Sequence, residues 1–442
     1  MCFHVGKSPA QLYGGFMHGG KQEQFREDAR AALAGRTPEE VAASLGPTAG
    51  TYRGLRPSTR ADESSARRLW KSMGLDPSPA LLESGAVDAL ECYARNIENC
   101  IGTVRVPIGI AGPLRVRGLH ARGDYFIPLA TTEAALVASY HRGSVLIGEA
   151  GGCTAILVRE ALSRVPVFLF DNLAEAGRFL CWTLEHLEEI KAAAEETGRH
   201  VRLRDVLPTL EGNHIYLGLE FLTGDASGQN MVTMAAQAAC DYLTNHCPIK
   251  AVASYTEGNM SGDKKASARA FVSTRGKKVT AEVLLPGPLL EKVLHVPASA
   301  LEEYWRVSAL GGVLSGTIGV QGHFANGLAA LYLATGQDVA CVAESAIGIT
   351  RFEARTDGSL YAAVTLPGIM VGTVGGGTGL PGQRACLELM GLAGEGHARA
   401  FAEVCAGLLL AGELSIIGAL AAGEFTRAHR KLARTRSIGL ST

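Results

Sequence analysis

The chain has 442 residues, more than one hydrophobic core normally holds, so several domains are expected. Its 42 lysines and arginines balance 43 aspartates and glutamates, which excludes a global charge that would attract nucleic acid or an anionic membrane. The ten cysteines never form a C-x-x-C pair, so neither a zinc site nor a disulfide framework is predicted. We expect a globular, cytoplasmic protein with reduced thiols and no bound metal.

The first part of the chain is polar and carries no recognisable chemistry. The start has no apolar run behind basic residues, so a secretory signal is not expected. Short helical patterns occupy residues 39–45 and 64–73, and a further helix is predicted near 80–96. We therefore expect an N-terminal arm and helical segment over residues 1–97.

A first candidate acid follows a strand-like region. Valine and isoleucine alternate with glycine and proline from residue 98 to 116, which predicts strands and tight turns. After a short apolar strand come Thr131 and Thr132 as cap candidates, and then Glu133 in the first turn of an alanine-rich helix. Favourable interaction with the helix dipole is a sufficient structural reason for this acid. We assign residues 98–164 to the first part of a large domain.

Residues 165–254 read as β-α-β-β-α-β, the ferredoxin-like pattern, and form an inserted domain of their own. Residues 255–442 then complete the large domain, so the predicted class is α+β: a large α/β domain with a ferredoxin-like insertion. The predicted elements of the insertion are strands 165–170, 201–207, 214–221 and 249–254 and helices 173–197 and 230–246.

The second helix of the insertion begins after TGDASGQNM, residues 223–231. Small residues and free amides at a helix N-terminus suit an anion such as a dinucleotide pyrophosphate, but an ordinary glycine turn explains them equally well. Arg199 and Arg202 could clamp a phosphate. No G-x-G-x-x-G follows a first strand, so a Rossmann fold is not indicated.

The loop YTEGNMSGDKKASAR, residues 255–269, carries three adjacent charges, Asp263, Lys264 and Lys265. Such a run is usually solvated surface. It gains interest because other acids and a histidine elsewhere in the chain could join a lysine in a proton-handling site that polarises a carbonyl group. The spacing alone does not prove that they meet.

An apolar, helix-like stretch over residues 314–342 holds His323, Asn326 and Asp338. Twelve residues separate Asn326 from Asp338, so both are predicted near one helix face. An acid in so apolar a helix needs a partner, and a lysine is the obvious one. Further on, the glycine loop of residues 366–382 could cradle phosphates or simply permit a tight crossing.

Residues 404–423 are apolar and long enough to span a bilayer, with a basic run behind them. A close-packed internal helix is the preferred reading, because Glu413 would be costly in lipid and the run is rich in glycine and alanine. His429 and Arg434 follow in the basic tail, where a histidine is usually just exposed.

Together these stretches resemble the 3-hydroxy-3-methylglutaryl-CoA (HMG-CoA) reductase family, in its class I-like, soluble form without a membrane anchor. The match covers residues 98–434, and nine ordered motifs do not arise by chance. They are ENCIG, PIGIAGPL, ATTEAALVAS, GDASGQNM, GDKK, HFAN, GQD, GTVGGGT and AGELS. The resemblance implies a large domain that binds the acyl-CoA, an inserted domain that binds NADPH, and active sites shared between subunits of a homodimer or higher oligomer.

The resemblance also implies the reaction, four-electron reduction of HMG-CoA to mevalonate and CoA through a mevaldyl-CoA hemithioacetal and mevaldehyde, a step of isoprenoid biosynthesis. Lys264 would stabilise the oxyanion and Asp338 would set the protonation of that lysine. Glu133 would protonate the aldehyde oxygen, and His429 the departing thiolate.

Further residues are implied to bind the two ligands. Asn326 would orient Lys264, while Arg164 and Lys265 would hold the free carboxylate. Arg199 and Arg434 would meet the 2′-phosphate, which favours NADPH over NADH. The substrate set is Arg164, Lys265, Asn326, Ser139, Asn259 and Asp263. The cofactor set is Arg199, Asp225, Ser227, Gly228, Asn230, Gly375, Gly376, Gly377 and Arg434.

Two departures keep alternatives open. Glu257 stands where the family usually has serine, close to where the substrate carboxylate is expected. Its negative charge would weaken binding of that carboxylate unless a cation intervenes. The family's further substrate lysine has no clear match, although Arg306 is nearby. A reductase for a different acyl-CoA is one alternative. A non-catalytic dinucleotide- or CoA-binding homologue is another, but it has no physical reason to keep all four catalytic residues.

Overall fold

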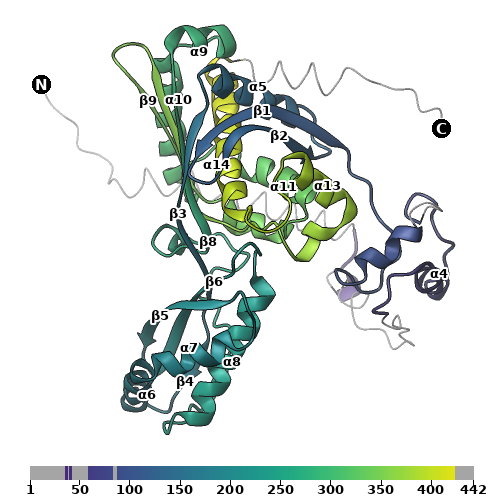
Figure 1. The fold of residues 1–442 in the computed structure, drawn as a ribbon, viewed down its shortest axis with the longest axis vertical. Helices are drawn as coiled ribbons and strands as arrows, with labels where there is room; N and C mark the ends of the chain where they lie inside the picture. Colours follow the sequence, from purple (N-terminus) through teal and green to yellow (C-terminus); the bar gives the residue numbers. More distant parts are fainter. Residues whose placement is uncertain (1–34, 38, 42–57, 83–86, 424–442) are drawn as a thin grey trace, which may run out of the picture. The chain divides into compact units, whose positions relative to one another are not determined.

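The computed structural model of the protein describes residues 35–37, 39–41, 58–82 and 87–423 (Figure 1). Contacts divide the chain into two units, Met1–Pro57 and Ser58–Thr442. In the first unit, Thr37 and Glu40 exchange two hydrogen bonds of 2.8 and 3.1 Å between backbone N–H groups and side-chain oxygens. This exchange is a capping box, and it begins the short helical turn found at residues 39–41.

The second unit begins with one clear helix, α4 (Glu63–Ser72), close to the predicted 64–73. Asp62 caps it by accepting a 2.7 Å hydrogen bond from the backbone N–H of Ser65. Where a helix was predicted near residues 80–96, the described residues 80–82 and 87–96 form the 3₁₀ helix η1 (Val87–Tyr93) and turns, so the prediction of an α-helix over these residues is wrong.

The larger part of the sheet has the strand order β2-β1-β3-β8-β10-β9. All neighbouring strands are antiparallel except β1 and β3, which are parallel. Its strands are β1 (Ile108–Gly118), β2 (Arg122–Ala130), β3 (Cys153–Arg164), β8 (Gly276–Leu285), β9 (Ile349–Ala354) and β10 (Leu360–Ile369). The long helix α14 (Ala398–Ala421) packs against β1, β3, β8 and β10 (Figure 1).

The smaller part of the sheet has the order β7-β4-β6-β5, antiparallel throughout. Its elements are β4 (Val167–Leu169), α6 (Leu173–Glu185), α7 (Leu187–Glu195), β5 (Arg202–Glu211), β6 (His214–Leu222), α8 (Gln229–His246) and β7 (Ala253–Tyr255). The single helix predicted over 173–197 breaks at His186, whose ring stacks on Trp182 with centroids 3.9 Å apart. The last strand starts later than predicted, after Pro248 and the turn that follows it.

Strand β3 joins the two parts of the sheet. It pairs with β8 as far as Ala161 and with β6 from Leu162 onward. Arg164, the last residue of β3, therefore lies at the junction, beside the start of the loop that carries Lys264.

The remaining helices surround the larger part of the sheet, and two of them correct the sequence predictions. Helix α5 (Leu136–Glu149) starts after Glu133, because Ala135 adopts a left-handed φ of 72°. Helix α11 (Phe324–Thr335) ends at the left-handed Gly336, so Asp338 is not helical and does not share a helix face with Asn326. The others are α9 (Gly287–Leu294), α10 (Ala298–Ser315), η2 (Ala268–Phe271), η3 (Val339–Cys341), α12 (Val342–Ser345), η4 (Gly376–Gly379) and α13 (Pro381–Leu389).

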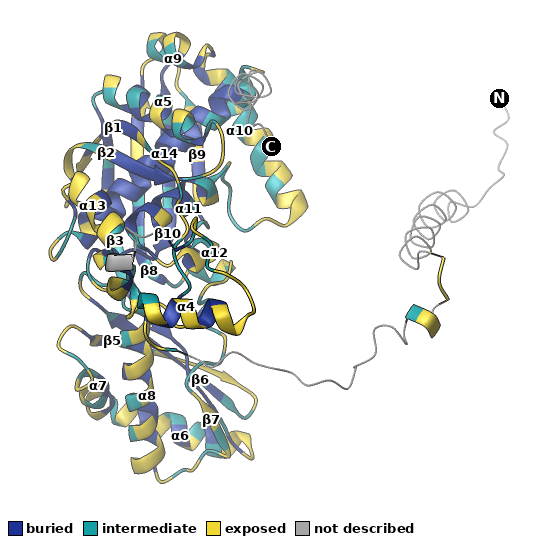
Figure 2. Ribbon diagram, turned by 90° about the vertical axis from the view of Figure 1, so that its right-hand side faces the viewer, coloured by how far each residue is buried: buried dark blue, intermediate teal, exposed yellow. Residues whose placement is uncertain are grey.

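Helix α14 is long and apolar enough to cross a membrane, but 83% of its most apolar stretch is buried inside the protein (Figure 2). Its Glu413 is fully buried and accepts hydrogen bonds from the N–H groups of Gly322 (2.7 Å) and His323 (2.9 Å) and from the Thr350 hydroxyl (2.8 Å). Protein donors thus satisfy a carboxylate that lipid would leave without partners. These contacts favour the core-helix reading.

Candidate functional site

The centre of the site is an ion pair between Lys264 and Asp338, with Nζ and Oδ2 2.8 Å apart. Lys264 lies in the turn after Gly262 with a left-handed φ of 55°. Asp338 caps η3 by accepting a 3.0 Å hydrogen bond from the N–H of Ala340. The lysine partner that the sequence predicted for this acid is confirmed, although Asp338 stands after the helix rather than in it.

The pair shifts both pKa values in directions that favour the charged forms. The hydrogen bond that Lys264 donates to Asp338 raises the pKa of Lys264 against a smaller opposing effect of burial. For Asp338, burial alone would raise the pKa, but hydrogen bonds from Lys264 and from Ala340 N–H outweigh it and lower the pKa. Both side chains remain partly exposed, so the ammonium group is held in place and still reachable by a ligand.

A cavity of about 670 Å³ lies beside this ion pair. It brings together segments that are far apart in the sequence: the GDKK loop, the GQD turn, the start of α8 and the glycine loop before η4. Its lining includes Lys264, Asp338, Ser227, Gly228, Asn230, Gly375, Gly376 and Gly377.

The glycine loop makes the tight crossing that its sequence allowed, and its open backbone leaves phosphate binding as a prediction. At Gly372, a Cβ atom would lie 2.4 Å from the backbone nitrogen of Ser227, so a tight crossing requires glycine there. Gly375 and Gly376, in contrast, have left-handed φ values of 73° and 54° and open space around the missing side chain. They leave bare backbone facing the cavity, as a phosphate-binding loop needs.

Asp225, a predicted cofactor residue, forms its hydrogen bonds with groups of the protein itself. Its carboxylate accepts hydrogen bonds of 2.8 Å from the N–H of Gly396 and 3.0 Å from that of Ala398, at the start of α14. Its backbone oxygen also accepts from Thr373 N–H at 2.8 Å. Asp225 thus fixes the loop that carries Ser227, Gly228 and Asn230, and it does not line either of the larger cavities found in the described chain.

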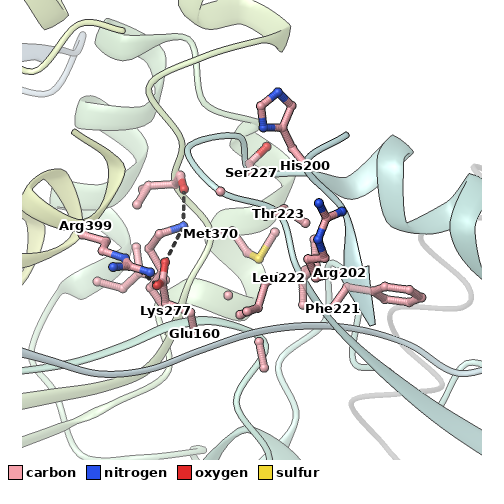
Figure 3. Close-up of a pocket in the computed structure, with 16 residues that line it drawn as sticks. Glu160, His200, Arg202, Phe221, Leu222, Thr223, Ser227, Lys277, Met370 and Arg399 are labelled. Carbon is pink, nitrogen blue, oxygen red and sulfur yellow. Dashed lines mark hydrogen bonds and ion pairs between the residues drawn. The ribbon is translucent and has the colours of Figure 1, made fainter. Parts of the chain in front are cut away.

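A second cavity, of about 240 Å³, also has Ser227 in its lining (Figure 3). Glu160 and Lys277 point toward one another there, with 3.7 Å between Oε1 and Nζ, and Glu160 Oε2 lies 2.7 Å from Arg399 Nε. Burial lowers the pKa of Lys277. The rim includes His200 and Arg202, whereas the predicted Arg199 is exposed and lines neither cavity.

Glu133 contacts Asn326 rather than Lys264. The Asn326 Nδ2 group lies 3.2 and 3.1 Å from the two carboxylate oxygens of Glu133. Neither residue lines the cavity beside Lys264 in the part of the chain described here. The expectation that Asn326 orients Lys264 is therefore not met within one copy of the chain.

Two other predicted substrate residues have local structural partners. Ser139, on α5, donates a 2.9 Å hydrogen bond from its hydroxyl to that of Ser415 on α14. Asn259 adopts a left-handed φ of 59° in the loop before Lys264. Asparagine tolerates this backbone conformation better than most residues, so the backbone conformation alone explains an asparagine at this position.

Arg164 is buried, with 7% of its surface exposed, and two carboxylates hold it. Its Nη1 atom lies 2.9 Å from Asp263 Oδ2 and 3.4 Å from Glu257 Oε2, and its Nη2 atom donates to Thr233 at 2.9 Å. A cation thus does stand beside the unusual Glu257. Lys265 remains exposed, with Nζ 2.9 Å from the backbone oxygen of Asp263.

Two functional candidates escaped the sequence analysis, Arg275 and Glu344. Arg275 contacts Asp263 Oδ1 at 2.5 Å and Glu344 Oε2 at 2.7 Å, and it donates to the backbone oxygen of Ser163 at 2.6 Å. Burial opposes ionisation of Asp263, but Arg275 and Arg164 lower its pKa overall. One signal in the sequence could have identified Glu344: it is a lone acid, six residues after Asp338, in a run of small and apolar residues.

His429 and Arg434 lie outside the described residues. Their predicted roles, thiolate protonation and 2′-phosphate binding, therefore remain predictions.

Comparisons with known proteins give one consistent result. Residues 65–434 match the family model for hydroxymethylglutaryl-coenzyme A reductase. The 3-hydroxy-3-methylglutaryl-coenzyme A reductase of Methanothermobacter thermautotrophicus is 43% identical over 351 residues, 79% of this chain and 88% of that protein. The Aeropyrum pernix reductase is 42% identical over 374 residues, 83% of this chain and 89% of that one. A class II reductase from Streptococcus pneumoniae, solved with NADPH in open conformations, has a similar fold, with a TM-score of 0.61, 20% identity and coverage of 81% and 97%.

Proposed function

Because the chain belongs to the hydroxymethylglutaryl-coenzyme A reductase family, we propose that it reduces HMG-CoA to mevalonate and CoA with NADPH as the reductant. The observation that carries this proposal is the 2.8 Å Lys264–Asp338 ion pair at the edge of a cavity lined by two glycine-rich loops. It combines a fixed cation for a developing oxyanion with backbone suited to a dinucleotide.

The cavity residues fit a dinucleotide. Open backbone at Gly375 and Gly376 suits phosphate groups, and Ser227 and Asn230 offer polar side chains at the same wall. NADPH, when bound, supplies a hydride to the thioester carbon and, in a second round, to the aldehyde carbon.

Lys264 provides the electrophilic assistance in this mechanism. As the thioester carbonyl becomes tetrahedral, negative charge develops on its oxygen, and the ammonium group stabilises that charge. The role requires a protonated lysine, which Asp338 favours by raising the pKa. Loss of the thiolate from the hemithioacetal gives mevaldehyde, and His429 would supply the proton that the thiolate needs.

Glu133 would protonate the aldehyde oxygen during the second reduction. Asn326 holds this carboxyl group through both of its oxygens. Since neither side chain lines the cavity of Lys264 in the described residues, we propose that Glu133 serves the Lys264 of a second copy in a homodimer or larger homo-oligomer. We assign residues 98–164 and 255–442 to the substrate-binding domain, residues 165–254 to the cofactor domain, and the protein to the cytoplasm.

A second candidate function is favoured by one specific contact. Glu257 pairs with Arg164, the residue expected to bind the free carboxylate of the substrate. A neutralised arginine suits an acyl-CoA without a second carboxylate better than HMG-CoA. The proposed alternative keeps the chemistry of Lys264 and changes only the acyl group.

Turnover by the purified wild-type chain tests both candidates. We expect NADPH oxidation with HMG-CoA, mevalonate as the product, two NADPH consumed per CoA released, and slower oxidation of NADH. No oxidation with HMG-CoA, but oxidation with an acyl-CoA that lacks the second carboxylate, would support the alternative instead. No oxidation with either would contradict both.

A further inference from the structure

One short segment, residues 338–345, contacts Lys264 at both of its ends. Asp338 pairs with the side-chain ammonium group at 2.8 Å. Glu344, on α12, lies with Oε1 3.3 Å from the backbone nitrogen of Lys264. Asp338 caps η3 and Glu344 lies on α12, which follows directly, so the segment can hold the lysine as a unit.

The contact with Glu344 matters because the backbone of Lys264 is in an unfavourable conformation. Its φ of 55° lies in the left-handed region, which costs free energy for a residue other than glycine. Such a conformation persists only when the surroundings fix it. The hydrogen bond from Lys264 N–H to Glu344, together with the turn closed by Lys265 N–H and Gly262 O at 3.1 Å, is what fixes it here.

The site of Glu344 requires a carboxylate rather than an amide. Its hydrogen-bond partners are donors: Lys264 N–H approaches Oε1, Arg275 Nε–H approaches Oε2 at 2.7 Å, and the Cys341 thiol also hydrogen-bonds the carboxylate. Glutamine has one acceptor oxygen, so its NH₂ group would face one of the two donors. Glu344 is 6% exposed and Arg275 is 4% exposed, so water cannot readily replace the lost acceptor.

Arg275 extends this support to the residue before Lys264. Its Nη2 atom pairs with Asp263, which also pairs with Arg164, and its Nη1 atom donates to Ser163 on β3. The alternating charges Glu344, Arg275, Asp263 and Arg164 therefore connect the loop of Lys264 to the junction strand.

We propose that Glu344 is a positioning residue that fixes the backbone of Lys264 and so keeps its ammonium group on Asp338. Its effect on turnover rests on the proposed function, because it acts through Lys264. Its effect on the lysine itself does not depend on turnover.

Kinetics of Glu344→Gln provide the first test, with Glu353→Gln as the matched control because Glu353 is an exposed acid paired with Arg351 on β9. We expect Glu344→Gln to lower kcat at least tenfold while the KM values for HMG-CoA and NADPH stay within about threefold. Glu344→Asp keeps the charge and should recover part of the lost kcat. The proposal is overturned if kcat stays within twofold of wild type, or if kcat is retained and only KM rises.

The second test measures Lys264 directly. The purified full chain is labelled with a small amine-reactive acylating reagent, and peptide mass spectrometry compares Lys264 with the exposed Lys191 on α7. A lysine released from Asp338 loses the interaction that raises its pKa, so more of it is neutral and reactive. We expect the Lys264:Lys191 rate ratio to rise at least threefold in Glu344→Gln, less in Glu344→Asp, and not at all in Glu353→Gln.

An unchanged labelling ratio in Glu344→Gln with wild-type Tm would overturn the proposal. If Glu344→Gln does not fold, the Lys264:Lys191 labelling ratio of Glu344→Asp tests the proposal in its place. If the wild-type chain fails to reduce HMG-CoA, the proposed function fails, and the labelling ratio still decides the role of Glu344.

Discussion

At the scale of single residues, the site depends on which charges are free and which are already paired. Lys264 pairs with Asp338 but remains partly exposed, so its charge is available to a ligand. Arg164 is buried between Asp263 and Glu257, so its charge is largely used within the protein. The two cations therefore differ in what they can offer a substrate.

Glu257→Ser should tighten binding of HMG-CoA, because it removes one of the two carboxylates beside Arg164 and leaves that guanidinium group with Asp263, which Arg275 shares. We expect KM for HMG-CoA to fall about fivefold, a typical effect of one nearby charge in a partly solvated site, with kcat and the KM for NADPH little changed. Glu257→Gln serves as the nearly isosteric control and should act in the same direction. A KM that is unchanged or higher in both variants would mean that Glu257 does not limit binding of the carboxylate.

Asp338→Asn should shift the pH dependence of turnover. Asp338 raises the pKa of Lys264, so its loss lowers that pKa and the ammonium form disappears at a lower pH. The alkaline limb of the kcat profile should then move to lower pH. Wild-type kinetics over the same pH range provide the reference. If the alkaline limb does not move, Asp338 does not control the protonation of Lys264.

At the scale of elements, α14 is both the central core helix and an anchor for the site. Its N-terminal amides hold Asp225, and Glu413 in its middle holds the residues just before α11. The helix thus connects the loop of Ser227 with the segment that leads to Asn326.

Glu413→Ala should destabilise the protein strongly, because it leaves the part-buried N–H groups of Gly322 and His323 and the buried Thr350 hydroxyl without this acceptor. We expect a loss of about 3 kcal/mol or more in the free energy of unfolding, seen as a clear fall in Tm. Glu388→Ala removes an exposed acid paired with Arg384 on α13 and should change Tm little. Equal Tm values for the two variants would contradict the core role of Glu413.

Element order was easier to predict than element ends. The alternation of apolar residues identified the strands and helices of 165–254 in their observed order, because hydrophobic periodicity is a local signal. The end of α11 was missed because Gly336 and Asp338 sit in an apolar run that reads as a continuous helix. The roles of Arg275 and Glu344 were missed for another reason, since 69 residues separate two side chains that meet only in the folded protein.

At the scale of the whole molecule, the described chain holds two separate groups of candidate catalytic residues. Lys264 and Asp338 share one cavity, whereas Glu133 and Asn326 form a separate pair. Motifs in the sequence indicated all four residues, but no sequence pattern shows whether they meet within one copy or between two.

Complementation between inactive variants tests the shared site. Glu133→Gln and Lys264→Ala should each be inactive alone, but their co-expressed mixture should recover roughly a quarter of wild-type activity, because half of randomly formed dimers are mixed and each mixed dimer has one intact site. Each variant mixed with itself is the control. A mixture as inactive as its components would assign Glu133 and Lys264 to the same copy.

The most direct test of the central claim is the turnover of Lys264→Ala, measured together with its NADPH affinity. We expect kcat with HMG-CoA to fall at least a thousandfold, because the ammonium group that stabilises the oxyanion is lost, while the Kd for NADPH stays within about threefold of wild type. Lys264→Arg, which keeps the charge but not the geometry, should also be impaired. A kcat of Lys264→Ala within tenfold of wild type would contradict the role of Lys264 as the group that stabilises the oxyanion.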